Sequence, residues 1–143
     1  MLIANMPKSG SIWRNKSLKR MTGLGHDQCS LAFMQNELDI YLPRVVASAG
    51  YNAVIQQHCR ATNANVAILQ GFGIRPIVLI RNLFDALISM HDFSDNGAVR
   101  NTFHQADWLE LDEVTRRDLG AETVAPCYVE FCASWVQADT AGK

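Results

Sequence analysis

Residues 6–13 read Met6-Pro7-Lys8-Ser9-Gly10-Ser11-Ile12-Trp13, and they lie between a short apolar run and a basic segment with helical character. A strand that ends in such a turn and continues as a helix directs several backbone N–H groups toward one point, because the first helical turn has no internal acceptors for them. The ammonium group of Lys8 adds a positive charge at the same point. The stretch therefore predicts a binding site for phosphate or sulfate near the start of the chain.

The length and composition predict one globular domain over residues 1–143, since 48% of the residues are hydrophobic and can form a buried core. The net charge of −1 argues against a surface that binds nucleic acid as a whole. The charge is unevenly distributed, however. The first 20 residues contain no acidic residue, and their basic residues are Lys8, Arg14, Lys16, Lys19 and Arg20. We expect this end of the chain to be locally electropositive.

The apolar runs are all much shorter than the roughly 20 residues that span a bilayer. The first residues also lack the charged and long apolar regions of a secretory signal, so we expect a cytoplasmic protein that has no membrane partner. The four cysteines, Cys29, Cys59, Cys127 and Cys132, have neither zinc-site spacing nor the density of a disulfide scaffold. We expect reduced thiols, most of them buried, and no metal site.

Three short apolar runs bounded by turn or polar residues predict β-strands over residues 2–6, 53–57 and 77–80. Their lack of clean alternation is typical of strands that are covered on both faces in a parallel sheet. A helix is predicted over residues 62–70, with Thr62 or Asn63 as its N-cap.

Two later segments have apolar residues at helical spacing. The first contains Leu83, Phe84, Leu87, Ile88 and Met90, and the second contains Val124, Tyr128, Phe131, Cys132 and Trp135. The acidic residues within 107–122 indicate a solvated, helix-capping stretch before the second segment. The order of strands and helices predicts an α/β fold in which helices pack on a parallel sheet.

Polar residues follow each predicted strand at its end. The first strand is followed by the Lys8 stretch, the second by His58-Cys59-Arg60 and the third by Arg81-Asn82. In open parallel sheets, ligands bind beyond the carboxyl ends of the strands. The three clusters are therefore expected at one rim of the sheet.

The Lys8 stretch is not a nucleoside triphosphatase P-loop, because that motif needs a glycine well upstream of the lysine and here Lys8 precedes Gly10. It resembles instead the 5′-phosphosulfate-binding loop of sulfotransferases that use 3′-phosphoadenosine 5′-phosphosulfate (PAPS), with the pattern Pro-Lys-Ser-Gly-Thr-Thr-Trp. The matching residues are Pro7, Lys8, Ser9, Gly10 and Trp13. Ser11 replaces the first threonine conservatively. Ile12 replaces the second, which removes one hydroxyl but keeps a backbone N–H.

A second segment, Arg81-Asn82-Leu83-Phe84-Asp85-Ala86-Leu87-Ile88-Ser89-Met90-His91-Asp92-Phe93, is similar to the 3′-phosphate motif of the same family. In that motif an arginine at a strand end and a serine eight positions later contact the 3′-phosphate, which here implies Arg81 and Ser89. The spacing is physically reasonable, because a serine about two helical turns along can face back toward the strand end. Asp85 matches the acid of the motif and is expected to cap or orient the first helical turn.

The resemblance also implies a catalytic role for His58, which ends the second predicted strand 23 residues before Arg81. In the cytosolic enzymes of the family, a histidine at this place takes the proton of the acceptor hydroxyl. A neutral imidazole suits that task near pH 7. Two alternatives stay open for other residues: Trp13 is a core aromatic or a wall of the adenine pocket, and Arg60 is a surface residue or a contact for an anionic acceptor.

The resemblance implies a sulfotransferase with a three-layer α/β/α fold like that of the P-loop nucleotide hydrolases. Its co-substrate would be PAPS, without a metal, and its acceptor a small molecule or a glycan. Lys8 and the N–H groups of residues 9–13 would bind the 5′ group and stabilise the charge of the leaving phosphate. Members of the family continue beyond a helix like that of residues 124–135 to a late loop over the nucleotide. The chain is therefore an N-terminal fragment or a reduced domain that binds the nucleotide poorly, and we expect the fragment.

Two other functions are compatible with the sequence. A non-catalytic module that binds 3′,5′-bisphosphoadenosine (PAP) would keep Lys8, Arg81 and Ser89 but would not need His58. A P-loop-like kinase would use a similar loop, but a Walker lysine and a Walker-B acid at a strand end are not visible. The acceptor is not identified by the sequence, and the segments expected to shape its pocket are residues 23–31 and 94–106.

Overall fold

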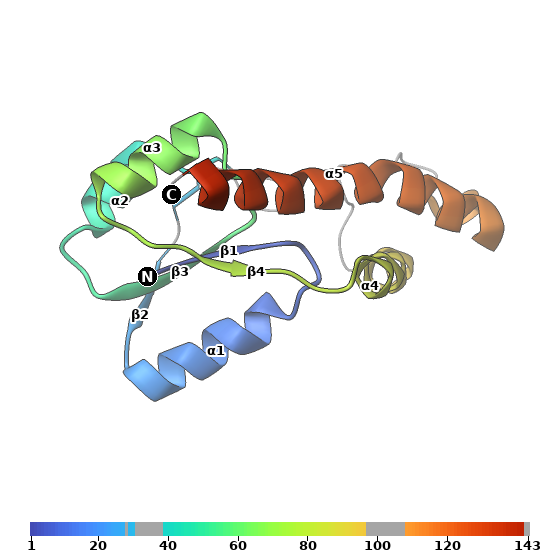
Figure 1. Ribbon diagram of the computed structural model, residues 1–143. Coiled ribbons are helices and arrows are strands. Elements are labelled where there is room, and N and C mark those ends of the chain that lie inside the picture. The colour runs from blue at the N-terminus through green and yellow to red at the C-terminus, as the bar shows by residue number, and fades with distance from the viewer. Residues whose placement is uncertain (28, 31–38, 97–107, 142–143) are drawn as a thin grey trace.

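The computed structural model describes residues 1–27, 29–30, 39–96 and 108–141, and within them it contains four β-strands and five α-helices (Figure 1). The strands are β1 (Leu2–Asn5), β2 (Gly25–Asp27), β3 (Ala53–Gln57) and β4 (Ile77–Leu79). The helices are α1 (Ser11–Thr22), α2 (Leu42–Ser48), α3 (Asn63–Gly71), α4 (Leu83–Asp95) and α5 (Glu113–Ala141), and a short 3-10 helix covers Trp108–Glu110. The prediction of an α/β fold is confirmed.

The strands form one parallel sheet in the order β2-β3-β1-β4. Strand β1 is fully buried and pairs with β3 on one side and with β4 on the other, with Ala4 opposite Gln57 and Val78. Because all four strands run in one direction, the segments that follow β1, β3 and β4 leave the sheet at the same rim. The rim that the sequence predicts is therefore present.

The core lies on both faces of the sheet, as two clusters of buried side chains. Alternate residues of a strand point to opposite faces, so Ile3 joins Val54 and Leu79 on the face where Leu18 of α1 packs. The neighbours of Ile3 in β1 belong to a larger cluster with the helices on the other face, which includes Leu2, Ala4, Ile55, Leu69, Ala86, Met90, Val124, Tyr128, Phe131 and Trp135. Helix α1 lies on one side of the sheet, and α2, α3 and the C-terminal half of α5 lie on the other (Figure 1).

Helix ends follow the local sequence. The side chain of Thr62 accepts a hydrogen bond from Asn65 N and caps α3, and Asp112 accepts one from Thr115 N at the start of α5. The N-cap of α4 is Asn82, whose side chain accepts from Phe84 N and Asp85 N. Of the two roles expected for Asp85, to cap or to orient the first turn, capping is therefore wrong, whereas Asp85 does lie in the first turn and pairs with Arg81.

The sequence analysis missed β2 and α2. Strand β2 falls inside residues 23–31, which were interpreted as an acceptor loop, and only His26 in its Gly-His-Asp sequence has appreciable side-chain bulk. Asp27 at its end accepts a hydrogen bond from the side chain of Ser48 in α2. The edge position of β2 and its short length leave it without the apolar run that marked the other strands.

The prediction that all three apolar strands are covered on both faces was wrong for β4. This strand is at the edge of the sheet, and its residues Ile77 and Val78 are 37% and 38% exposed. Of the cysteines, Cys29 and Cys59 are buried, Cys127 and Cys132 are partly buried, and none forms a disulfide. Ser94 and Asp95, at the start of the second segment expected to shape the acceptor pocket, belong to α4, and residues 97–106 lie outside the described residues.

We predict that Tyr128→Phe leaves the protein as stable as the parent or stabilises it by about 1 kcal/mol. The ring is buried in the core, but its hydroxyl oxygen has no hydrogen-bond partner among the described residues. Burial also raises the pKa of this hydroxyl. Removing it removes an unpaired polar group and leaves the packing unchanged.

The measurement is urea-induced unfolding of the parent and the variant. Tyr128→Leu is the control, because loss of the ring creates a cavity and should destabilise by about 2 kcal/mol or more. A loss of more than 1 kcal/mol in Tyr128→Phe, on the order of one buried hydrogen bond, would show that the hydroxyl has a partner.

Candidate functional site

The loop between β1 and α1 has an unusual backbone conformation. Gly10 is the N-cap of α1 with φ 80°, and Lys8 has φ 62°, so that two residues of this short turn are in the left-handed region. Glycine adopts this conformation freely, whereas lysine is strained in it, and strain of this kind is concentrated at functional sites. Within the described chain no side chain caps α1, and its first turn contains no acidic residue. The positive end of the helix is thus left open.

The two serines of the loop have different surroundings. The Oγ atom of Ser9 is buried and has no hydrogen-bond partner among the described residues. Ser11 is buried as well, but its Oγ accepts a hydrogen bond of 2.9 Å from Nε2 of Gln56 in β3. Asn15 donates to the other end of the same amide, Oε1 of Gln56, at 3.2 Å. Ser11 therefore also fixes α1 to the sheet, a role that the sequence analysis did not predict.

The ammonium group of Lys8 lies 4.0 Å from the centre of the Phe93 ring in α4. The pKa of Lys8 is lowered from its ordinary value, mainly by burial and further by the neighbouring Arg81, while Asp92 opposes the shift. Sequence reasoning missed Phe93 and Asp92 as neighbours of Lys8. Both residues are in the segment that resembles the 3′-phosphate motif, which was the one available signal.

The structure brings Arg81 and Lys8 together. Nη1 of Arg81 donates a hydrogen bond of 3.2 Å to the backbone oxygen of Lys8, and Nε of Arg81 lies 3.9 Å from a carboxylate oxygen of Asp85. The side chain of Arg81 is 42% exposed, so it has room for a further partner. Two loops that are 73 residues apart in the sequence thus carry two cations at one rim of the sheet.

Ser89 and the two apolar residues of the loop complete the predicted set. Ser89 is half-buried on α4, and its side chain makes no hydrogen bond with the part of the chain that the structure describes. Trp13 is 72% exposed and Ile12 is 67% exposed. Of the two interpretations of Trp13, the core aromatic is therefore wrong, and an exposed ring beside the loop remains. The Arg60 side chain forms an ion pair with Glu130 of α5, which agrees with the interpretation of Arg60 as a surface residue.

His58 follows β3 at the same rim and is largely buried. Its Nδ1 atom lies 2.9 Å from the backbone oxygen of Asn5 and 2.8 Å from Nδ2 of the same residue, at the end of β1. Burial lowers the pKa of His58 from its ordinary value of 6.5, and the contact with the Asn5 carbonyl partly opposes the shift. The imidazole is therefore neutral at pH 7. Asn5 was not among the predicted site residues, because in the sequence it is one polar residue at the end of an apolar run.

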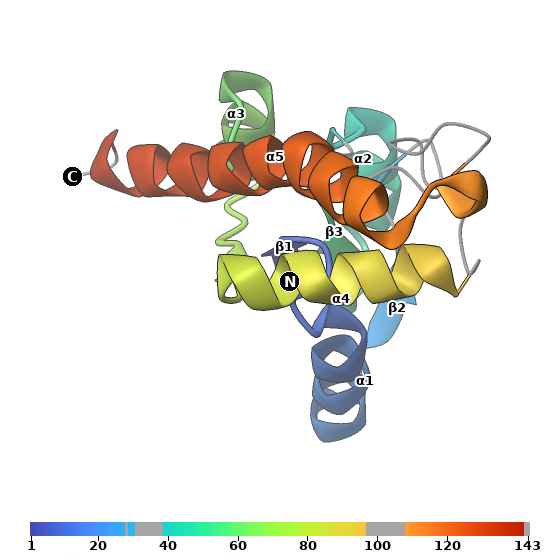
Figure 2. The ribbon, with the colours of Figure 1, turned by 90° about the vertical axis from the view of Figure 1, so that its right-hand side faces the viewer.

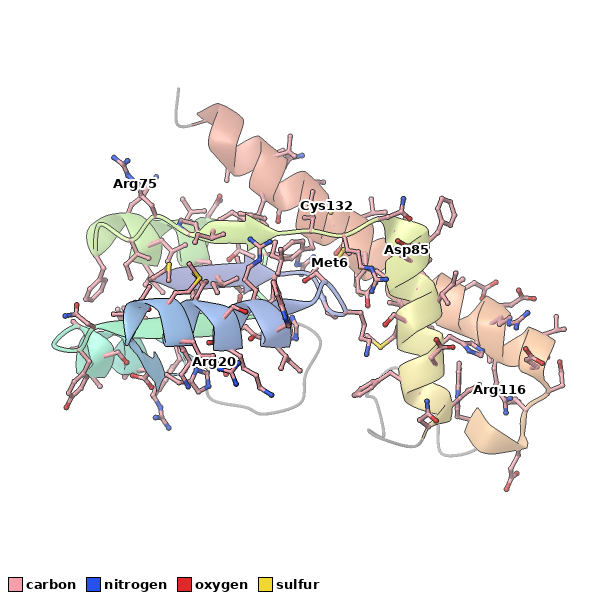
Figure 3. All side chains as sticks on the ribbon, turned by 90° about the horizontal axis from the view of Figure 1, so that it is seen from below. Met6, Arg20, Arg75, Asp85, Arg116 and Cys132 are labelled. Carbon is pink, nitrogen blue, oxygen red and sulfur yellow. The ribbon has the colours of Figure 1, made fainter. Side chains whose placement is uncertain are left out.

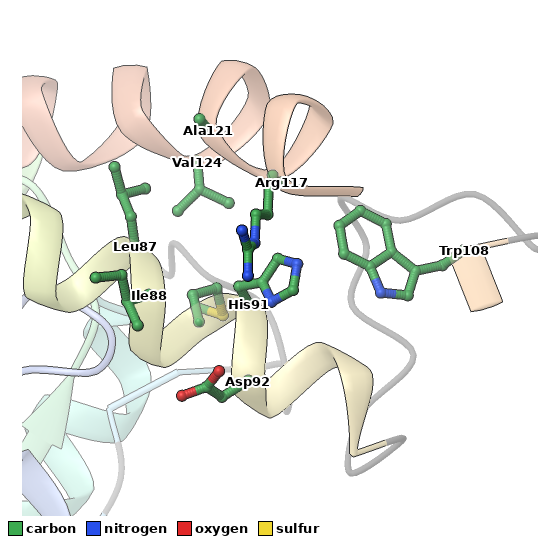
Figure 4. A pocket seen from close by; sticks show the side chains of 10 residues that line it. Leu87, Ile88, His91, Asp92, Trp108, Arg117, Ala121 and Val124 are labelled. Carbon is green, nitrogen blue, oxygen red and sulfur yellow. The ribbon is translucent and has the colours of Figure 1, made fainter. Parts of the chain in front are cut away.

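Helix α4 lies beside the N-terminal half of α5 (Figure 2). A separate cavity of about 450 Å³ lies between these two helices and Trp108 (Figure 4). Its walls are mainly apolar, and His91 and Arg117 point toward one another within it (Figure 4). Asp92, whose negative charge raises the pKa of Lys8, is one of the residues that line this cavity. None of the predicted site residues lines this cavity.

Within the described ranges, no group of three or more His, Cys, Asp or Glu side chains is placed to hold a metal ion. None of the helices described combines the length and apolar content needed to cross a bilayer. In comparisons with known proteins, no protein-family model, no curated protein and no solved structure matches the chain. The sequence, the fold and the geometry of the rim are therefore the grounds for a functional conclusion.

We predict that His58 titrates below 6.5 and that acidification destabilises the protein through this residue. The unfolded chain takes up the proton at the ordinary pKa and the folded protein at a lower one. Between these two values the unfolded state binds more protons, so the free energy of unfolding decreases as the pH falls.

An NMR titration of the imidazole signals, assigned with His58→Gln, measures the pKa. Unfolding by urea at about pH 7.5 and about pH 5.5 measures its effect, and the parent should lose more stability than His58→Gln. Titration of His58 at or above 6.5 would contradict the prediction.

Proposed function

We propose that the chain is the nucleotide-binding part of a sulfotransferase, which moves the sulfuryl group of PAPS to a hydroxyl or amine of an acceptor. In this proposal the sheet and its helices correspond to the three-layer α/β/α fold of the P-loop nucleotide hydrolases. The two motifs that resemble the family, residues 6–13 and 81–93, support the proposal from the sequence.

The observation that carries the proposal is the hydrogen bond from Arg81 to the backbone oxygen of Lys8. The resemblance assigns Lys8 to the 5′ group of the nucleotide and Arg81 to its 3′-phosphate. Both groups are carried by one ribose, so the cations that bind them must lie at neighbouring points. Had the two cations been on opposite faces of the molecule, one nucleotide could not have contacted both.

Three further features of the rim suit a bisphosphate nucleotide. The open N-terminus of α1 offers N–H groups to the 5′ group, and Ser9 Oγ, buried without a partner among the described residues, would gain one from the bound anion. The hydroxyl of Ser89 makes no hydrogen bond with the described residues, so it is available to contact a 3′-phosphate. The exposed ring of Trp13 is available to stack on a base.

The proposed reaction is an in-line displacement at sulfur. Nε2 of His58 takes the proton from the acceptor hydroxyl, the acceptor oxygen bonds to sulfur, and the bond from sulfur to the 5′-phosphate oxygen breaks. The products are the sulfate ester and PAP, and the proton stays on His58 until solvent removes it. Lys8 and the N–H groups of the loop stabilise the negative charge that develops on the leaving phosphate oxygen.

We expect PAP to raise the melting temperature by several degrees, because a ligand at 100 times its Kd adds about 2.7 kcal/mol of stability. AMP, which lacks the 3′-phosphate, should raise it less. In Arg81→Ala, the additional effect of PAP over AMP should disappear, because the guanidinium is the cation assigned to the 3′-phosphate.

Arg75→Ala is the matched control, since Arg75 is exposed and lies before β4, at the opposite end of the sheet from Asp85 (Figure 3). Its response to PAP should equal that of the parent. Equal stabilisation of the parent by PAP and AMP, or an Arg81→Ala variant that still distinguishes them, would contradict the assignment of the 3′-phosphate site.

We expect His58→Ala to lower the rate of sulfuryl transfer by about 100-fold or more while leaving PAP binding unchanged. The measurement is transfer of labelled sulfate from PAPS to a panel of phenols, sugars and amines, beside PAP titration by calorimetry. A variant as active as an active parent would remove His58 as the base. PAP binding without any transfer by the parent would favour the non-catalytic PAP-binding module.

A further inference from the structure

Asn5 is a buried polar residue in the centre of the sheet. It ends β1, its exposure is 0%, and its neighbours in the strand are apolar. A buried amide in such a place is unfavourable unless its polar atoms are paired. Its position next to the nitrogen Nδ1 of His58 gives it a specific partner.

The two atoms of Asn5 near His58 require different protonation states of Nδ1. The backbone oxygen, 2.9 Å away, can only accept a hydrogen bond, so it requires a proton on Nδ1. The side-chain Nδ2, 2.8 Å away, can only donate one, so it requires Nδ1 without a proton. One neutral imidazole cannot satisfy both atoms.

The backbone oxygen determines the protonation of Nδ1, because the strand holds this oxygen in place. The side-chain amide, in contrast, can turn by 180° about its last bond. The oxygen and nitrogen of an asparagine amide occupy equivalent positions, and their assignment follows from the hydrogen bonds they make. In the present orientation Nδ2 of Asn5 also donates to the backbone oxygen of Met6 at 3.5 Å, which is a long hydrogen bond, and Oδ1 is buried without a partner among the described residues. Turning the amide gives up this long contact and brings Oδ1 to Nδ1, so that both neighbours of the ring nitrogen are acceptors.

We propose that Asn5 is a positioning residue that holds the proton of His58 on Nδ1 and so leaves the lone pair on Nε2. This inference rests on the proposed function for its meaning, since Nε2 is then the atom that takes the proton of the acceptor. No hydrogen bond joins Nε2 to the described residues, so this atom is available to a substrate. Free imidazole prefers the opposite arrangement only weakly, and the backbone oxygen of Asn5, held in place by β1, is sufficient to reverse it.

The direct test is the tautomer of His58 in the parent protein, read from the ¹⁵N shifts of its ring at about pH 8, where the ring is neutral. We expect the proton on Nδ1 in the parent. In Asn5→Ala the backbone oxygen remains and only the side-chain acceptor is lost, so the proton should stay mainly on Nδ1 with a larger share of the other tautomer than in the parent. Asn5→Asp should keep the proton on Nδ1 and raise the pKa of His58 by about one unit or more, because a carboxylate within hydrogen-bond distance favours the imidazolium. A proton on Nε2 in the parent would overturn the proposal.

Asn65→Ala is the matched control for the loss of a buried asparagine. Asn65 is also buried, and its amide donates to the backbone oxygen of Arg60 and to the carboxylate of Asp39 rather than to a histidine. This variant should be destabilised but should keep the parental tautomer of His58. If Asn5→Ala does not fold, the parent and Asn5→Asp still decide the question.

Activity separates this inference from the function on which it rests. In an active chain, Asn5→Ala should reduce kcat by about two- to threefold, because one of the two acceptors at Nδ1 is lost and the backbone oxygen remains. Asn5→Asp should retain activity with the acidic limb of its pH profile moved to higher pH. A parental kcat and pH profile in Asn5→Ala would overturn the positioning role. The NMR result needs no PAPS, so a parent with its proton on Nδ1 but no affinity for PAP would reject the proposed function and keep the Asn5 contact.

Discussion

The pairing of β1 with both β3 and β4 is the constraint on which the other features of this protein depend. Strand β1 is completely buried, and its parallel register with both neighbours fixes where each of the three strands ends. The loop of Lys8, the side chain of His58 and the side chain of Arg81 all follow these ends. A shift of one residue in either register would turn the buried side chains to the wrong face and separate the polar groups at the rim.

The extent to which the sequence predicted the fold differs between the central and the edge elements. Strands β1 and β3 and helices α3, α4 and α5 have apolar patterns that are long enough to identify. The edge strand β2 has three residues and no apolar run, so local sequence does not mark it. Strand β4 was located, but its exposure was not predicted, because an apolar run is compatible with the edge as well as the centre of a sheet.

The candidate site was predicted as a set of residues but not as a network. The sequence identified Lys8, Arg81, Ser89 and His58, and the parallel topology placed the strand ends together. It could not identify Asn5, Phe93 or Gln56 as their partners, because each belongs to a different element and the contacts are set by tertiary packing. The local sequence is sufficient to predict that Asn82 caps α4. The resemblance to the 3′-phosphate motif led instead to the prediction of a capping or orienting role for Asp85.

Both cations at the rim have internal partners that an anion can displace. The contact of Lys8 with Phe93 contributes about 0.5–2 kcal/mol. The pair of Arg81 and Asp85 is solvent-exposed and long, and pairs of this kind contribute about 0–1 kcal/mol. Hydrogen bonds from a cation to phosphate are roughly twice as strong as neutral ones. The internal contacts therefore hold the side chains near the rim without preventing them from binding a phosphate.

Burial has opposite consequences for the two groups that the proposed reaction uses. It lowers the pKa of His58 and so keeps the imidazole neutral and able to accept a proton. It also lowers the pKa of Lys8, and the nearby charge of Arg81 lowers it further, which opposes the charged form that the leaving phosphate needs. A bound bisphosphate reverses this second effect, because its negative charge favours the ammonium form of Lys8 and offsets the repulsion from Arg81. In the proposed reaction, the nucleotide itself thereby strengthens the cation that stabilises its departure, while the hydrogen bonds at the end of β1 hold the imidazole in place.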